Sequence, residues 1–127
     1  MKNPLQVFDR HYIVSTNEVL CKKSGYQHGT TSEGYEPAKE IFRIAADEPA
    51  LDMVEVTEIF RQLHKTAPFL FLNGNTFADV GKTILSFAYT THSPEIRSVV
   101  GHHIAGKEIL SKEDLAKAFE DEARRSC

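Results

Sequence analysis

The sequence is poor in the features that mark several common classes of protein. It has only two cysteines, Cys21 and Cys127, which are too few and too far apart for a disulfide framework and favour a reducing, cytoplasmic setting. No apolar run approaches the roughly 20 residues that a membrane-spanning helix needs, and residues 1–5 lack the apolar core of a signal peptide. The formal net charge of −3, without any block of Lys and Arg, argues against general nucleic-acid binding.

The composition that remains is that of an ordinary globular domain. The chain has 127 residues, of which 41% are hydrophobic and 26% are charged. This length supports one hydrophobic core without help from disulfides or metal. We therefore expect residues 1–127 to form a single domain.

The apolar residues between positions 53 and 67 recur at steps of three and four, which is the helical period. Asp52 precedes them and suits the cap of a helix. An earlier helix is expected to begin at Pro37, because proline suits the first helical position, and to end at Asp47-Glu48-Pro49. The apolar face of the helix after Asp52 comprises Met53, Val56, Phe60, Leu63 and Ala67.

The N-terminal third carries weaker signals. Residues 5–14 predict a short strand or an irregular segment, and Ser15-Thr16-Asn17 could cap one or two helical turns that begin at Glu18. Residues 24–35 contain three glycines and several hydroxyl residues, which predicts a loop. Two tyrosines and a histidine in this loop could contact a ligand, although a mobile connector with solvent-facing rings is the simpler interpretation.

Three further helices are expected after position 75. Residues 76–79 are spaced as a capping box for a helix that reaches about His92, in which Gly81 would allow close helix packing. Ser93-Pro94 suits the cap and first position of the next helix, and a second capping box at residues 111–114 would begin the last. The sequence thus predicts a mainly α, compact domain of about five to six helices with at most a short strand or hairpin.

The stretch from Pro68 to Thr76 joins two of these helices and is the most suggestive part of the chain. Its apolar run ends in Asn73-Gly74-Asn75-Thr76, and such a turn places backbone N–H groups at the start of a helix, where anions bind. A P-loop would need G-x-x-x-x-G-K-[S/T]. Thr76 stands at the first-glycine position of that motif and Gly74 lies two residues too early, so the spacing argues against a P-loop.

The six histidines include His92 and the adjacent pair His102 and His103. Adjacent histidines on a helix point about 100° apart, so both rarely reach one ion. A zinc site usually needs an i,i+4 pair or a cysteine pair, and the sequence has neither. We therefore expect no metal site, with one of His102 and His103 packed in the core and the other exposed.

From Val54 onward the order of features resembles the Fic/Doc superfamily, in particular the short Doc-type toxins of toxin–antitoxin pairs. Ala67-Pro68-Phe69-Leu70 stands where that family has H-P-F-x, and Phe71-Leu72 resembles a two-residue insertion. Asn73-Gly74-Asn75 stands for D-G-N, and residues 100–111 resemble the family's segment before its final helix. The resemblance implies a small helical fold and a loop that grips phosphate, with ATP and magnesium, for phosphoryl or nucleotidyl transfer.

The resemblance also implies that catalytic groups are missing. In the family the motif histidine takes a proton from a target hydroxyl, an acid binds magnesium and a basic residue grips phosphate. The corresponding positions here are Ala67, Asn73 and Phe77, and His64 lies one helical turn too early to replace the histidine. Loss of a general base alone lowers a rate about 10²–10⁴-fold, so the resemblance implies a degenerate copy.

Three hypotheses follow. The first is a degenerate Fic/Doc-like domain, cytoplasmic, that acts as a divergent toxin–antitoxin component or a protein-binding module with impaired phosphoryl or nucleotidyl transfer. Asn73, Gly74, Asn75 and Thr76 would bind an anion or nucleotide, with ATP and magnesium if a phosphate site survives. Its partner would be an antitoxin-like or target protein, without nucleic acid or membrane.

The alternative comes from another class. It is a small helical ligand-binding domain or enzyme, with a pocket formed by residues 24–35 and the turn at residues 73–75. The third hypothesis is a structural interaction domain that uses residues 24–35 as its contact surface. Magnesium-dependent thermal stabilisation by ATP would support a surviving phosphate site, whereas no shift with any nucleotide would favour a partner-binding function.

Overall fold

The computed structural model describes residues 3–89 and 93–125, and within these ranges it is mainly helical and has no strand. The mainly α prediction is therefore confirmed. The β-type pairing in these ranges is an isolated bridge between Thr30 and Phe69. The elements in chain order are η1 (Pro4–Gln6), a single 3₁₀ turn, followed by α1 (Arg10–Ser24), α2 (Ser32–Ala46), α3 (Met53–Thr66), α4 (Asn73–Tyr89), α5 (Pro94–Ile104) and α6 (Lys112–Arg125).

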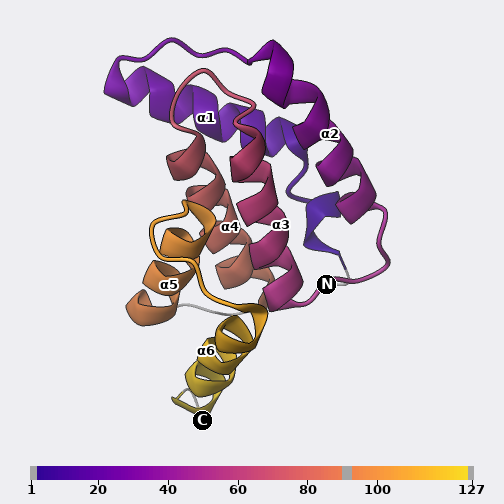
Figure 1. The fold of residues 1–127 in the computed structure, drawn as a ribbon, viewed down its shortest axis with the longest axis vertical. Coiled ribbons are helices and arrows are strands. Elements are labelled where there is room, and N and C mark those ends of the chain that lie inside the picture. The colour runs from indigo at the N-terminus through magenta and orange to yellow at the C-terminus, as the bar shows by residue number, and fades with distance from the viewer. Residues whose placement is uncertain (1–2, 90–92, 126–127) are drawn as a thin grey trace.

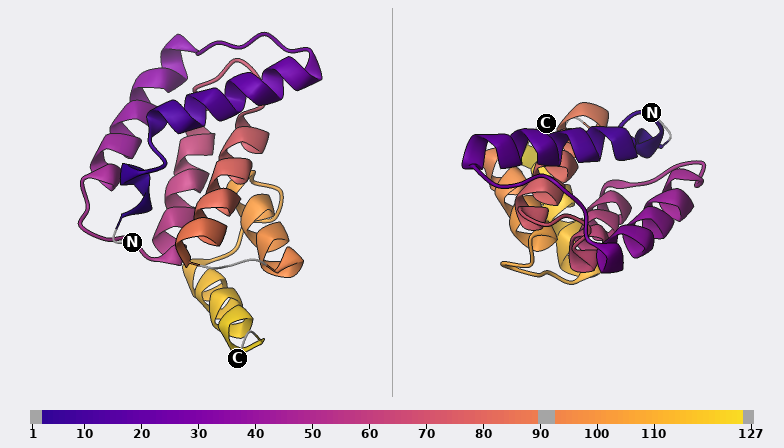
Figure 2. Two further views of the ribbon diagram at one scale, coloured as in Figure 1. Left: turned by 180° about the vertical axis from the view of Figure 1, so that it is seen from behind. Right: turned by 90° about the horizontal axis from the view of Figure 1, so that it is seen from above.

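Helices α3 and α4 form the centre of the domain (Figure 1). α5 packs against both of them, α2 packs along α3, and α1 crosses the end of the bundle at which α4 begins. Figure 2 shows α6 projecting from the opposite end. The fully buried apolar side chains of the central helices include Val56, Phe60, Phe77, Val80 and Ile84. Within the described ranges, no helix combines the length and apolar character needed to cross a membrane.

The starts of α3 and α5 follow the chemistry that the sequence predicts. The Asp52 carboxylate accepts the Glu55 N–H at 2.8 Å, and the Glu55 carboxylate accepts the Asp52 N–H at 3.0 Å, which completes a capping box. Ser93 caps α5 through its hydroxyl, and Pro94 occupies the first helical position. These local signals place both helices correctly.

Gly81 and the adjacent histidines also lie as predicted. A Cβ atom at Gly81 would lie 2.6 Å from Ile104 Cδ1, so α4 and α5 approach closely at this glycine. His103 is buried and His102 is exposed. α4 is described as far as Tyr89, and the predicted end of this helix near position 92 lies outside the described residues.

The N-terminal third differs from the prediction. α1 begins at Arg10 and is capped by Asp9, whose carboxylate accepts the Tyr12 N–H at 3.1 Å. Of the strand or irregular segment expected at residues 5–14, the strand is wrong, and residues 7–9 alone lie outside a helical element. The cap expected at Ser15-Thr16-Asn17 is also wrong. Helix α1 continues through this polar triplet because Ser15 is exposed to solvent and Thr16 and Asn17 have hydrogen-bond partners within the fold. The Thr16 hydroxyl, for example, donates back to the Tyr12 carbonyl at 2.9 Å.

The loop predicted at residues 24–35 is shorter in the structure. It ends at Thr31, which caps α2, so residues 32–35 are helical and Pro37 lies inside α2 rather than at its first position. The Thr31 hydroxyl accepts a backbone N–H of the first turn of α2 and donates to the Ala67 carbonyl at 2.9 Å. This contact with the end of α3 fixes where α2 begins, and the local sequence does not show it.

Candidate functional site

The segment between α3 and α4 is bounded by two residues in the left-handed region of backbone conformation. Ala67 has φ 48° and Leu72 has φ 64°, which costs a non-glycine residue about 1–2 kcal/mol. Asn73 holds the bend between them, because its Oδ1 accepts the Phe69 N–H and its Nδ2 donates to the Phe69 carbonyl, both at 2.9 Å. Strained backbone conformations are often found at functional sites, where the surrounding structure holds them in place.

Helix α4 begins at Asn73, so the capping box predicted at residues 76–79 is wrong. The Thr76 N–H already donates to the Leu72 carbonyl at 2.9 Å and is therefore part of the helical hydrogen bonding. The Thr76 side chain is fully buried, and its hydroxyl accepts from Asn17 Nδ2 at 2.9 Å. Thr76 thus joins α4 to α1 rather than capping a helix.

Asn17 of α1 holds the same segment from the other side. Its buried Nδ2 donates to the Phe71 carbonyl and to the Thr76 hydroxyl, each at 2.9 Å. Its Oδ1 lies 2.9 Å from His28 Nδ1. A buried amide that is satisfied on both sides fixes its neighbours firmly. The sequence gives no sign of this role, because the partners on the segment lie 54 and 59 positions away.

A hollow of about 740 Å³ opens at the start of α4. Gly74 and Asn75, from the first turn of the helix, line it. Asn73 and Thr76 do not, because the Asn73 amide is engaged with the loop and Thr76 is buried. The structure therefore brings two of the four predicted binding residues to one cavity. The N–H groups of a first helical turn have no partner within the helix and can face a ligand there.

Cationic side chains surround this cavity, which we call the basic hollow. Its lining includes Lys23, Lys82, Arg97, Lys107 and His102, against one carboxylate, that of Asp79. None of these four lysine and arginine side chains forms an ion pair with a carboxylate in the described part of the chain. Arg97 is oriented by the Lys82 carbonyl and the Ser86 hydroxyl, which leave its charge uncompensated. The basic hollow is thus a positive region on a chain of net charge −3.

These cations come from separate segments of the chain. Lys23 lies on α1, Lys82 on α4, Arg97 on α5 and Lys107 just after α5. Steps of three and four residues could have placed Asn75 and Lys82 on one face of α4. No spacing in the sequence shows that this face meets α1 and α5. The sequence therefore predicted the turn at the hollow and missed its charged walls.

His64 lies beside Gly74, although its position in the sequence appeared too early for the site. A Cβ atom at Gly74 would lie 3.5 Å from His64 Nε2. Arg61 NH1 lies 3.1 Å from His64 Nδ1, and since arginine only donates, Nδ1 accepts and Nε2 carries the proton. Burial, and after it the Arg61 charge, lowers the pKa of His64, so the ring is neutral at pH 7. A hydrogen bond with the Ile104 backbone opposes these effects but does not outweigh them. The unprotonated Nδ1 is engaged by Arg61, so His64 is a poor base beside the turn.

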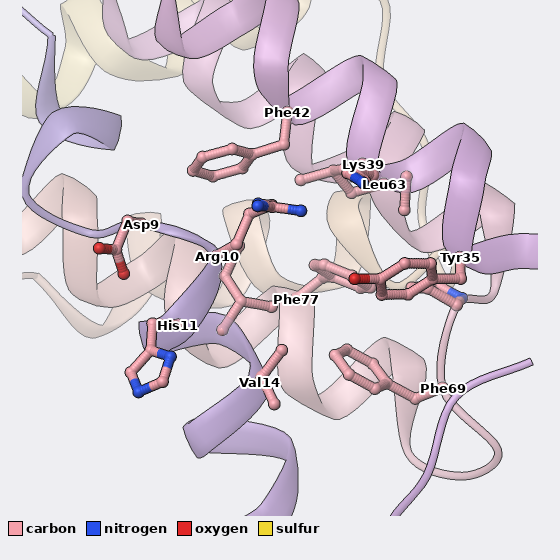
Figure 3. A pocket seen from close by; sticks show the side chains of 13 residues that line it. Asp9, Arg10, His11, Val14, Tyr35, Lys39, Phe42, Leu63, Phe69 and Phe77 are labelled. Atoms are coloured by element: carbon pink, nitrogen blue, oxygen red, sulfur yellow. The ribbon is translucent and has the colours of Figure 1, made fainter.

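A second hollow, of about 440 Å³, lies between α1 and α2, and its lining is shown in Figure 3. We call it the aromatic hollow, after Phe42, Phe69 and Phe77. Tyr35 lines this cavity, whereas the turn at residues 73–75 contributes to the basic hollow. The alternative hypothesis predicts one pocket formed by residues 24–35 and the turn at residues 73–75. In the structure, Tyr35 and this turn line different cavities.

No group of His, Cys, Asp and Glu side chains that could hold a metal ion occurs within the described ranges. Comparisons of this chain with protein-family models, with curated proteins and with solved structures each found no match. The Fic/Doc resemblance therefore stays a prediction that rests on the residues themselves.

Proposed function

We propose that this protein is a degenerate Fic/Doc-like domain that binds the phosphate groups of a nucleotide in the basic hollow. The observation that carries this proposal is that the first turn of α4, at Gly74 and Asn75, meets four lysine and arginine side chains that form no ion pair within the described ranges. Backbone N–H groups and cations together suit a phosphate. The volume of about 740 Å³ lies in the range of small-molecule sites.

The domain is proposed to bind ATP with magnesium without efficient phosphoryl or nucleotidyl transfer. Ala67 has no side chain that could accept a proton, and Phe77 is buried in the core. The neutral Asn73 amide is occupied by the Phe69 backbone and is a weaker magnesium ligand than a carboxylate. His64 Nδ1, the unprotonated ring nitrogen, accepts from Arg61 and is not free to act as a base. These four positions support the proposal of impaired transfer.

The variant Asn75→Asp tests the binding site. The side chain is exposed and the change keeps its shape, while a negative charge in the first turn stabilises a helix by about 0.3–1 kcal/mol. The fold should therefore persist, and calorimetry should show ATP–magnesium binding at least tenfold weaker than in the wild type. Gln62→Glu adds the same charge on an exposed part of α3 and should bind normally. Equal binding by the Asn75→Asp variant would remove the basic hollow from the proposal.

Incubation with labelled ATP and cell proteins tests the absence of efficient transfer. Neither labelled phosphate nor labelled AMP should pass to protein above the level of a no-enzyme control. Transfer that is robust in the wild type and lost in Asn75→Ala would show an active transferase, and the impaired reading would be wrong. The nucleotide-binding measurement is independent of this result.

A protein partner, either antitoxin-like or a target, forms the second part of the proposed function. It is supported by an exposed apolar group beside the turn, in which Tyr26 stacks on Phe71 with ring centroids 4.9 Å apart and Leu70 lies next to them in sequence. The free, buried Cys21 fits the reducing, cytoplasmic setting proposed for this pair. Co-expression with the product of an adjacent gene should give a complex that Phe71→Ser weakens and Phe87→Ser, at another exposed ring, leaves intact.

A further inference from the structure

The aromatic hollow has an apolar floor that the core holds in place. Phe42 of α2, Leu63 of α3 and Phe77 of α4 are all buried, as is Phe69 of the segment before α4. The rings of Phe69 and Phe77 lie 5.9 Å apart and support each other. Because these side chains also belong to the main hydrophobic core, the floor is formed before any ligand arrives.

Two cationic side chains lie over this floor. Figure 3 shows Arg10 and Lys39, from α1 and α2, in the middle of the view with the Tyr35 hydroxyl. Neither cation has an ion-pair partner in the described part of the chain.

The other polar lining residues do not compensate these charges. Asp9, the one carboxylate in the lining, accepts the Tyr12 N–H as the cap of α1. Figure 3 shows Asp9 and His11 to one side of the cavity. The aromatic hollow therefore combines an apolar floor with two available positive charges from different helices.

We infer that the aromatic hollow binds a small apolar carboxylate. The apolar part of the ligand would pack on the rings of the floor, and its carboxylate would lie between Arg10 and Lys39. There the carboxylate would accept charge-assisted hydrogen bonds from both side chains, which are about twice as strong as hydrogen bonds between neutral groups. A volume of about 440 Å³ equals about 15 water molecules at roughly 30 Å³ each. The ligand should therefore have on the order of 10–15 non-hydrogen atoms. This site is separate from the basic hollow and does not depend on the function proposed for it.

Calorimetric titration with decanoate, below its micelle concentration, tests this site. Decanoate should bind at least tenfold more tightly than decylamine, which has a similar body and the opposite charge. The double variant Arg10→Gln, Lys39→Gln changes only exposed side chains and should weaken decanoate about tenfold while leaving decanol unchanged. Absence of decanoate binding, or equal binding of decylamine, would overturn the inference.

A matched pair of valine substitutions on α1 locates the ligand. Val14 is 36% exposed and lines the aromatic hollow, so Val14→Phe should fill the cavity and reduce decanoate affinity at least tenfold. Val19 is 51% exposed and lines neither hollow, so Val19→Phe should bind decanoate as the wild type does. Thermal melts of both variants report whether the fold is retained. Undiminished binding by a folded Val14→Phe variant would place the ligand elsewhere and refute the assignment.

Discussion

Replacing Gly34 with alanine would disturb a close contact between α2 and the end of α3. Gly34 lies in the first turn of α2, against the end of α3. A Cβ atom there would lie 2.3 Å from the Thr66 carbonyl oxygen and 2.4 Å from that of Ala67. Both neighbours are backbone atoms, so no side-chain rotation can relieve the contact. The first turn of α2 would have to move away from α3.

The size of the effect follows from three contributions. Overpacking of this kind costs about 1–3 kcal/mol. Separation of the helices also weakens the hydrogen bonds from Thr31 to the Ala67 and Pro68 carbonyls, at about 1 kcal/mol each. Alanine gains up to about 1 kcal/mol over glycine in a helix. The free energy of unfolding should therefore fall by about 2–4 kcal/mol, which lowers Tm by roughly 10 °C in a domain of this size.

Gly74→Ala is the matched control, because Gly74 also lies in the first turn of a helix. Its nearest neighbour would be His64 Nε2 at 3.5 Å, an ordinary contact. This variant should equal the wild type in stability or exceed it by up to about 1 kcal/mol. Urea unfolding followed by circular dichroism measures both variants. A Gly34→Ala variant as stable as the wild type, or a Gly74→Ala variant that loses as much, would refute the steric explanation.

Three further substitutions test other contacts. Ala67→Gly should raise the free energy of unfolding by about 0.5–1 kcal/mol in urea titration, because φ 48° is unfavourable for alanine and not for glycine; a loss of stability would show that the strain is absent. Asn17→Ala should lower it by about 3 kcal/mol, since the Phe71 carbonyl and the Thr76 hydroxyl lose a buried donor; a change below about 1 kcal/mol would contradict this role. The Ser93 hydroxyl, and with it Arg125, lowers the pKa of Glu122, so the native state has stability that is complete above the ordinary glutamate pKa and is lost as pH falls through the native pKa. Thermal melts below about pH 5 should therefore decline less steeply in Glu122→Gln than in the wild type, and parallel declines would contradict the shift.

The starts of α3 and α5 were predictable because their signals are local. The capping box of Asp52 and Glu55 and the cap at Ser93 involve residues three positions apart or adjacent. Helix α1 was not predictable, because its buried face does not follow hydrophobicity. Val19 is exposed, while the polar Asn17 is buried and finds its partners on α4 and the preceding segment. In the sequence, a polar residue that is buried with distant partners cannot be distinguished from a polar residue that caps a helix, which is why Asn17 was interpreted as part of a cap.

The candidate site was predictable only where it is continuous in the sequence. The turn at Gly74 and Asn75 was found, because an apolar run followed by Asn and Gly marks a helix start. Lys23 and Lys107 reach the same cavity from segments far apart in the chain. His64 was set aside on spacing, yet the bend after α3 brings Gly74 back beside its ring. A cluster of cationic side chains that comes from separate segments of the chain cannot be recognised in the sequence, because only the fold brings these side chains together.

The hydrogen bonds of Asn17 make the start of α4 depend on α1. Without that helix, the Phe71 carbonyl and the Thr76 hydroxyl would lose their donor, and Leu72 would be held less firmly at φ 64°. The basic hollow is therefore a property of the whole cooperative unit and cannot be isolated as a fragment. Ligand occupancy of the hollow and unfolding of the core should share one midpoint in denaturant.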